Sequence, residues 1–254
     1  MEEKTTTNQP LIERLFAAGS HFGFQKSRRH PTVVPYIFGA KHGTDIFDLE
    51  KTSTLLDAAK EVMKKAGSQG KTVLFVGTKD EASAVVKEMA EKAEMPMVIN
   101  RWIGGMLTNF GEIKRRLARL EDLVSQGESG ELERKYTKKE RVLIKREMEK
   151  LMFNFGGIRT LKKTPDLMVV VDPRHDSIAV TEAKDIKIPV VGIMSSDTNL
   201  KSVNVPVIVN DALRSSIKLA LNELIAAYQD GRASYTPAPV EDRRNRRPQL
   251  QTQR

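Results

Sequence analysis

The sequence contains no cysteine, which excludes disulfide bonds, thiol catalysis and zinc sites with thiolate ligands. It has only four histidines, and their spacing matches no common metal site. It also lacks any apolar run close to the ~20 residues that span a bilayer, and no signal-peptide core follows its polar N-terminus. These absences predict a cytoplasmic protein with no cofactor and no metal.

Positive charge, in contrast, is in excess. Lysine and arginine number 42 against 33 acidic residues, which gives a net charge of +9 and an isoelectric point of about 9.6. Such a balance favours a polyanionic partner, either a nucleic acid or an acidic membrane surface. With 254 residues, of which 39% are hydrophobic, the chain can bury the core of one large or two modest domains.

Five short apolar runs, rich in β-branched residues, have the composition of buried parallel strands. They occupy residues 71–77, 97–100, 167–172, 189–194 and 205–209. Helical patterns lie between and after them, at about 81–93, 178–184 and 211–228. This alternation predicts an α/β fold: a flavodoxin-like, doubly wound, five-stranded parallel sheet with strand order 2-1-3-4-5.

The segment before this sheet has its own pattern. A short helix is expected from residue 11 until Gly19 stops it, and a longer one, capped by Asp48 or Thr52, to about residue 66. Between them lie an irregular segment, residues 20–31, and a short hairpin, residues 33–49. The irregular segment interleaves cations with aromatic rings, which suits RNA, although the rings could equally fill a core.

One insertion interrupts the alternation of strands and helices. Apolar residues recur at heptad-like spacing in its two arms, which are joined by a turn at residues 125–130: Ile113, Leu117, Leu120 and Val124, then Ile144, Met148, Leu151 and Phe155. This pattern predicts an α-helical coiled-coil hairpin. The outer faces of both arms are cationic. A charged helix face is often only solvated, but an arm that projects from a domain implies that something is held against it.

These patterns divide the chain into four parts. Residues 1–9 are expected to be a disordered N-terminus, and residues 232–254 a disordered, arginine-rich basic tail. The α/β domain takes residues 10–109 and 156–231, and the inserted helical hairpin takes residues 110–155. The tail could contact RNA or remain without a partner.

Residues 101–109 contain the only tryptophan and end where the insertion begins. The Gly104–Gly105 pair is expected to act as a hinge, and Thr108 or Asn109 could cap the helix that follows. Trp102 has two possible roles: its ring could stack on RNA, or it could brace the core at the hinge.

Two loops at the carboxyl ends of predicted strands are candidates for chemistry. Residues 77–79 could hold a phosphate, but the P-loop spacing is absent and a tight turn needs the same residues. Residues 172–176 place an aspartate near a histidine, which could act as a base or bind a metal with Asp197, but a polar loop with a capping aspartate is the favoured explanation. The sequence therefore does not support an enzyme or a small-molecule substrate.

Several motifs occur in an order that resembles the bacterial S-two ribosomal protein family of the small subunit. The similarity spans roughly residues 8–232, and the motifs are His21-Phe22-Gly23, Phe38-Gly39-Ala40, Leu49-Glu50-Lys51-Thr52, Phe75-Val76-Gly77-Thr78-Lys79, residues 101–109, Gly156-Gly157-Ile158 and Pro165-Asp166. The resemblance implies a structural protein that contacts 16S rRNA and neighbouring ribosomal proteins, with no catalysis. In some bacteria the family also docks the large mRNA-binding ribosomal protein numbered one.

The chain departs from the family pattern in three places. Phe24 replaces a second histidine, residues 208–212 replace a Pro-Gly-Asn-Asp-Asp run, and Leu200-Lys201 replaces a continuation with proline. These departures indicate a divergent lineage and weaken residue-level inferences for those loops.

Charge and position together suggest where RNA or protein partners bind. The expected contacts are Lys26, Arg28, Arg29, Lys41, Arg101, Trp102, Asn109, Lys114, Arg115 and Arg116.

Two other hypotheses remain. A nucleotide-binding enzyme would use residues 77–79 or 172–176. A membrane-surface protein would need an uncovered apolar helix face, whereas every apolar stripe here is expected to have an internal partner.

Overall fold

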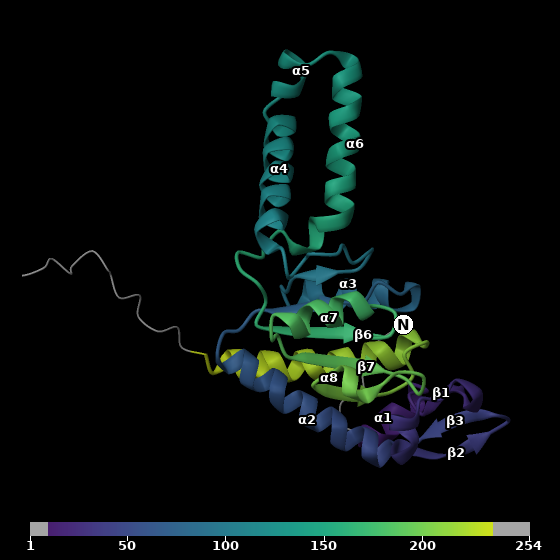
Figure 1. The fold of residues 1–254 in the computed structure, drawn as a ribbon. Coiled ribbons are helices and arrows are strands. Elements are labelled where there is room, and N and C mark those ends of the chain that lie inside the picture. The colour runs from purple at the N-terminus through teal and green to yellow at the C-terminus, as the bar shows by residue number, and fades with distance from the viewer. Residues whose placement is uncertain (1–9, 236–254) are drawn as a thin grey trace, which may run out of the picture.

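A five-stranded parallel sheet forms the centre of the computed structural model, which describes residues 10–235 (Figure 1). Neighbouring strands are parallel, and they lie in the order β5-β4-β6-β7-β8. Their bounds are Val73–Val76 (β4), Met97–Val98 (β5), Leu167–Val171 (β6), Val190–Met194 (β7) and Val205–Ile208 (β8). The predicted α/β class and the five parallel strands are confirmed, although all five strands are shorter than predicted.

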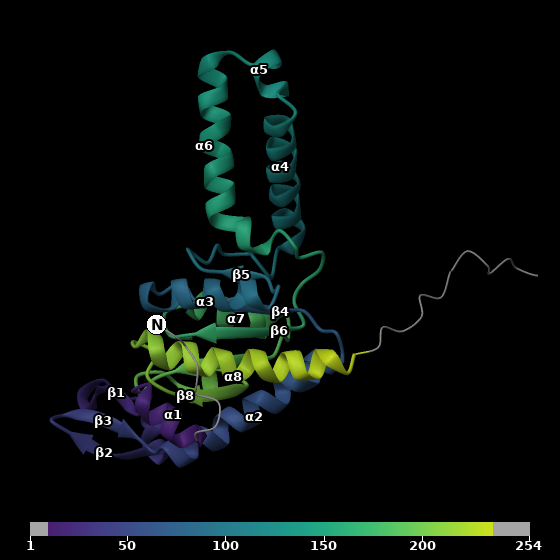
Figure 2. The same ribbon diagram turned by 180° about the vertical axis from the view of Figure 1, so that it is seen from behind.

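Alternate residues of each strand point to opposite sides of the sheet, and here both sets are apolar. Helices therefore cover both faces of the sheet. Val73 and Phe75 face one core, which holds side chains of α1 (Leu11–Ala17), α2 (Leu49–Ser68), α3 (Asp80–Lys92) and α8 (Arg214–Ala233). Leu74 and Val76 face a second core, formed with α7 (Ser177–Asp185) and residues from the base of the insertion (Figure 2). No helix among residues 10–235 is long and apolar enough to span a membrane.

The two longest helices of the domain, α2 and α8, pack backbone against backbone. A Cβ added at Gly67 would lie 2.2 Å from the carbonyl oxygen of Tyr228, and one added at Gly231 would lie 2.0 Å from that of Lys64. Asp48 caps α2, since its side chain accepts hydrogen bonds from two backbone amides of the first turn. The contact with α2 also explains why α8 continues past its predicted end to Ala233.

A small antiparallel sheet lies beside the domain, at the end remote from the insertion (Figure 1). Its order is β1-β3-β2, with bounds Phe22–Gln25 (β1), Ile37–Lys41 (β2) and Thr44–Phe47 (β3). The predicted hairpin is therefore present. The prediction of an irregular segment was wrong for β1, which the hairpin edge and the hydroxyl of Ser196 hold extended: the amide of Phe24 donates to that hydroxyl at 2.9 Å.

The insertion projects from the domain as two long helices (Figures 1 and 2). They are α4 (Phe110–Glu128) and α6 (Lys138–Phe155), with the short α5 (Glu131–Lys135) at the tip. Residues 125–128 belong to α4 and not to a turn, because Gly130, in the left-handed conformation, makes the reversal. Leu123 is buried in place of Val124, and in α6 only Phe155 is fully buried.

Candidate nucleic-acid interface

The base of the insertion is organised by one carboxylate, that of Glu182 on α7. Its Oε1 atom accepts hydrogen bonds from the indole Nε1 of Trp102 at 3.1 Å and from the amide of Gly105 at 2.7 Å. Its Oε2 atom accepts from the amides of Leu107 and Thr108, at 3.0 and 3.3 Å, and from the Thr108 hydroxyl at 3.2 Å. One buried side chain therefore fixes the path of the chain into α4.

Glu182 is only 7% exposed, so its ionisation depends on these partners. Burial alone would raise the pKa of this carboxyl, but the hydrogen bonds from Leu107, Trp102, Gly105 and Thr108 outweigh burial and lower the pKa below its ordinary value. The residue is therefore a carboxylate at neutral pH, and it satisfies backbone amides that would otherwise be buried without partners.

Trp102 is 7% exposed and belongs to the core between the sheet and the insertion. Of its two possible roles, the structure supports bracing the core, because its ring is covered and its indole nitrogen is already bonded. Neither predicted cap forms: Asn109 precedes α4 but makes no capping hydrogen bond with its side chain, and the Thr108 hydroxyl is bonded to Glu182.

Only one of the two hinge positions requires a glycine. Gly105 has a φ of +88°, in the left-handed region that side chains disfavour. Gly104 has no positive φ, and a Cβ there would meet nothing within 4 Å. At the other end of the insertion, a Cβ on Gly157 would lie 2.2 Å from the carbonyl oxygen of Met97 in β5.

The predicted cations of α4 lie exposed near the base of the arm. The Lys114 ammonium lies 5.3 Å from the ring centroid of Phe110, and Arg115 pairs with Glu112 at 3.0 Å. Arg116 is exposed, as are Arg101 and Asn109 in the connection before the helix. The structure thus brings these five predicted contacts to the surface at one end of the insertion.

The other arm is more strongly cationic. Five exposed side chains of α6 have no carboxylate within 4 Å in the described part of the chain: Lys138, Lys139, Lys145, Arg146 and Lys150. The cationic outer face predicted for this arm is therefore present, but none of its residues was among the contacts expected from the sequence. Four apolar side chains of α6 are also exposed, namely Val142, Leu143, Met152 and Phe153. The expectation that every apolar stripe has an internal partner was therefore wrong for α6.

The basic residues near the small sheet have different roles. Lys26 and Lys41 are exposed. Arg28 is exposed as well, with its guanidinium 4.8 Å from the ring centroid of Phe24. Arg29 instead binds the buried carboxylate of Asp45 with two hydrogen bonds, one of them 2.7 Å long, so its charge is already compensated inside the protein.

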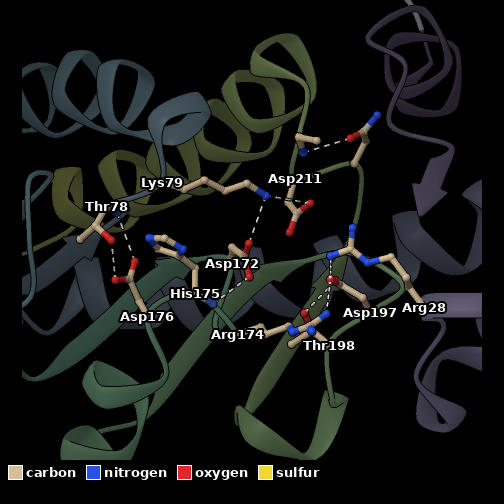
Figure 3. Close-up of polar contacts among 12 residues, drawn as sticks. Arg28, Thr78, Lys79, Asp172, Arg174, His175, Asp176, Asp197, Thr198 and Asp211 are labelled. Atoms are coloured by element: carbon tan, nitrogen blue, oxygen red, sulfur yellow. Dashed lines mark hydrogen bonds and ion pairs between the residues drawn. The ribbon is translucent and has the colours of Figure 1, made fainter. Parts of the chain in front are cut away.

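The loops proposed for chemistry meet at the carboxyl edge of the main sheet (Figure 3). The Lys79 ammonium lies 3.1 Å from Asp172 and 3.5 Å from Asp211. The amide and hydroxyl of Thr78 donate to Asp176. The lysine and the loop amide that a phosphate would need are therefore bonded to carboxylates, which would repel an anion.

An open cavity of ≈ 410 Å³ lies beside this cluster, and its rim is as acidic as it is basic. Asp197 anchors two arginines there, Arg174 at 2.6 Å and Arg28 at 3.6 Å. Among the residues that the structure describes, no group of three histidine or acidic side chains is placed to hold a metal ion. The geometry gives no support to a phosphate site or a metal centre.

Asp211 is the one carboxyl at this edge with no exposed surface. Burial and the neighbouring carboxylate of Asp172 raise its pKa to about 7, against the opposing effect of Lys79. Burial also opposes the charged form of Lys79, but Asp211 and Asp172 outweigh it and raise the lysine pKa. The cluster is a compensated ionic network inside the fold.

Comparison with known proteins agrees with the resemblance found in the sequence. Residues 15–231 match the family model described as ribosomal protein S2. The chain belongs to the ribosomal protein S2 family. This is a family of ribosomal proteins and not of enzymes.

Three relatives show how far the similarity extends. The small ribosomal subunit protein uS2c of Rhodomonas salina is 41% identical over 91% of this chain and 95% of its own length. The uS2 protein of Campylobacter fetus is 40% identical, over 86% of this chain and 84% of its own. That of Salinibacter ruber is 38% identical, over 89% and 70%.

Substitution of the two hinge glycines should separate their roles. Gly105→Ala should lower the free energy of unfolding by about 1–2 kcal/mol, because alanine disfavours a left-handed backbone. Gly104→Ala should change it by less than about 0.5 kcal/mol. Urea denaturation of both variants measures the difference, and equal losses would refute the assignment of the hinge to Gly105.

Glu182→Gln should destabilise the fold by about 3 kcal/mol. The glutamine side chain replaces one acceptor oxygen with an NH2 group, which would face the hydrogen-bond donors of residues 102–108. The lowered pKa of Glu182 also stabilises the wild type above the unfolded pKa, near 4.5, and this contribution is lost as the pH falls through the folded pKa. Because the indole of Trp102 donates to Glu182, the emission of this single tryptophan should change in the variant. Asp185→Asn, on the exposed side of α7, is the control and should leave both stability and emission unchanged.

Asp211→Asn should alter how stability depends on pH. Folded Asp211 retains a proton up to about pH 7, whereas the unfolded chain releases it near 3.8, so this group lowers wild-type stability as the pH rises between those values. The unfolding free energy of the variant relative to wild type should therefore rise by on the order of 2 kcal/mol from pH 5 to pH 8. A constant difference across that range would show that Asp211 does not titrate there.

Proposed function

We propose that this chain is a structural component of the small ribosomal subunit that binds 16S rRNA and neighbouring ribosomal proteins and performs no catalysis. The observation that carries the proposal is the helical hairpin, whose exposed cations are largely without intramolecular partners. Family membership and the names of the relatives agree with it.

The hairpin is suited to hold RNA phosphates. A cation with no carboxylate nearby keeps its full charge for a partner and releases counterions when it binds. Five such residues lie on α6, while Lys114, Arg115 and Arg116 add charge near the base of α4. We expect Arg101 and Asn109, in the connection before α4, to extend this contact surface.

A second basic region lies at the opposite end of the molecule, beside the small sheet (Figure 1). We expect Lys26, Arg28 and Lys41 to contact RNA or protein there. Two separated contacts raise the overall affinity without a strong site at either one, since binding at the first concentrates the second. We assign Arg29 and Trp102 to holding these surfaces in place, since both are bonded internally.

The proposed domain boundaries follow from these assignments. The α/β domain, residues 10–109 and 156–231, would be a flavodoxin-like platform, and residues 110–155 a coiled-coil hairpin that projects from it. The predictions for residues 1–9 and for most of the tail, 236–254, lie outside the described residues.

Neither rival hypothesis gains comparable support. A nucleotide-binding enzyme would need free cations at the carboxyl edge of the sheet, where Lys79 and Arg174 are bound to carboxylates. A membrane-surface protein would need a continuous apolar face, whereas the exposed apolar side chains of α6 are separated by lysine and arginine.

Charge reversal on α4 tests the proposal. Arg115→Glu with Arg116→Glu should reduce incorporation into small subunits several-fold, because two phosphate contacts become repulsive. Lys64→Glu with Lys65→Glu makes the same charge change on α2, which lies on the far side of the domain from the hairpin, and should incorporate normally (Figure 1).

Sedimentation of native lysates at low and high salt measures the outcome. The wild type should migrate with the small subunit and be released as salt rises. Normal incorporation of the α4 variant would remove that arm from the contact surface, and a free monomer at every salt concentration would refute the ribosomal role.

A further inference from the structure

One exposed face of α6 combines cations with an unpartnered aromatic ring. Lys139, Val142, Arg146, Lys150 and Phe153 follow one another at spacings of three, four, four and three residues, which places them along a single face of a helix. All five are exposed, and Phe153, at 59%, is the most exposed of the apolar residues of α6. The face opposite to this one packs towards α4.

Phe153 is held at the base of the hairpin and does not lie on a free end. Its carbonyl oxygen accepts a hydrogen bond from the side-chain amide of Asn100, at 2.7 Å, which ties this turn of α6 to the connection that carries Arg101. The next buried residue, Phe155, is anchored in the core. The ring therefore projects from a fixed backbone, so that a partner would order little on binding.

A shallow hollow of ≈ 360 Å³ lies beside the ring, lined by Met148, Glu149, Met152 and Phe153. Thioether and aromatic surfaces favour contact with flat, polarisable groups. Glu149 is the only carboxylate among the hollow's lining residues, and it could accept a hydrogen bond from an exocyclic amine of a base.

We propose that Phe153 is a stacking platform for an unpaired base of the RNA, with Arg146 and Lys150 bound to the adjoining phosphates. The charge of the face selects this partner, because three cations lie along it and none has a carboxylate within 4 Å in residues 10–235. Aromatic rings between cations bind single-stranded segments in this way. The inference rests on the proposed function and adds the type of RNA element that this surface accepts.

Stacking and charge respond differently to salt, and this difference provides the test. Phe153→Ala should raise the Kd for a 16S rRNA transcript about 5- to 100-fold with little change in the salt dependence of log Kd. Phe153→Leu, which keeps apolar bulk without a ring, should behave similarly, and Phe153→Trp should retain affinity with RNA-dependent quenching of its emission. Arg146→Gln with Lys150→Gln should instead reduce the salt slope by about 1.5.

Leu143→Ala is the matched control, because it removes exposed apolar surface from the same helix away from the hollow, and it should bind as the wild type does. If the ring variants bind normally while the charge variant is weakened, the stacking inference is overturned and the proposed function stands. If none changes Kd, RNA binding by α6 itself fails. If the ring variants bind RNA normally but exclude a neighbouring ribosomal protein from the subunit, the hollow is a protein-docking surface and the inference is again wrong.

Discussion

The position of the inserted hairpin depends on the hydrogen bonds to the carboxylate of Glu182. This residue lies on α7, a helix of the domain, yet its five hydrogen bonds all go to residues 102–108, which lead into α4. A buried negative charge is costly unless donors surround it. Here the donors are amides, a hydroxyl and an indole, so the same bonds that stabilise the charge also set the direction of the hairpin.

At the carboxyl edge of the sheet, in contrast, buried and partly buried carboxylates are held by cations. Lys79 links Asp172 to Asp211, and Asp197 holds two arginines. In many doubly wound proteins this edge binds a ligand. In this chain its charged groups pair with one another, so this edge lacks the free cations that an anionic ligand would need.

The sequence predicted the parts of the fold that depend on local patterns. Short β-branched runs marked the strands, and heptad-like spacing marked the two arms of the insertion. It could not predict pairings between residues far apart, such as Trp102 with Glu182 or Arg29 with Asp45. Without those partners, an arginine that is bonded inside the fold and one that is free at the surface have the same appearance in a sequence. The exposed ring of Phe153 was missed for the converse reason, because an apolar residue on a helix is normally assigned to a core.

The hairpin is long and joins the domain beside the sheet, so a small rotation at its base moves its tip by a large distance. Helix α4 has 19 residues, so the arm is ~28 Å long, and a rotation of about 10° at its base would displace the tip by about 5 Å. Small differences in backbone angle near Gly105 are therefore magnified at α5. The tight hydrogen bonding at the base gives the distant tip a defined position, and a long arm without it would sweep through many orientations.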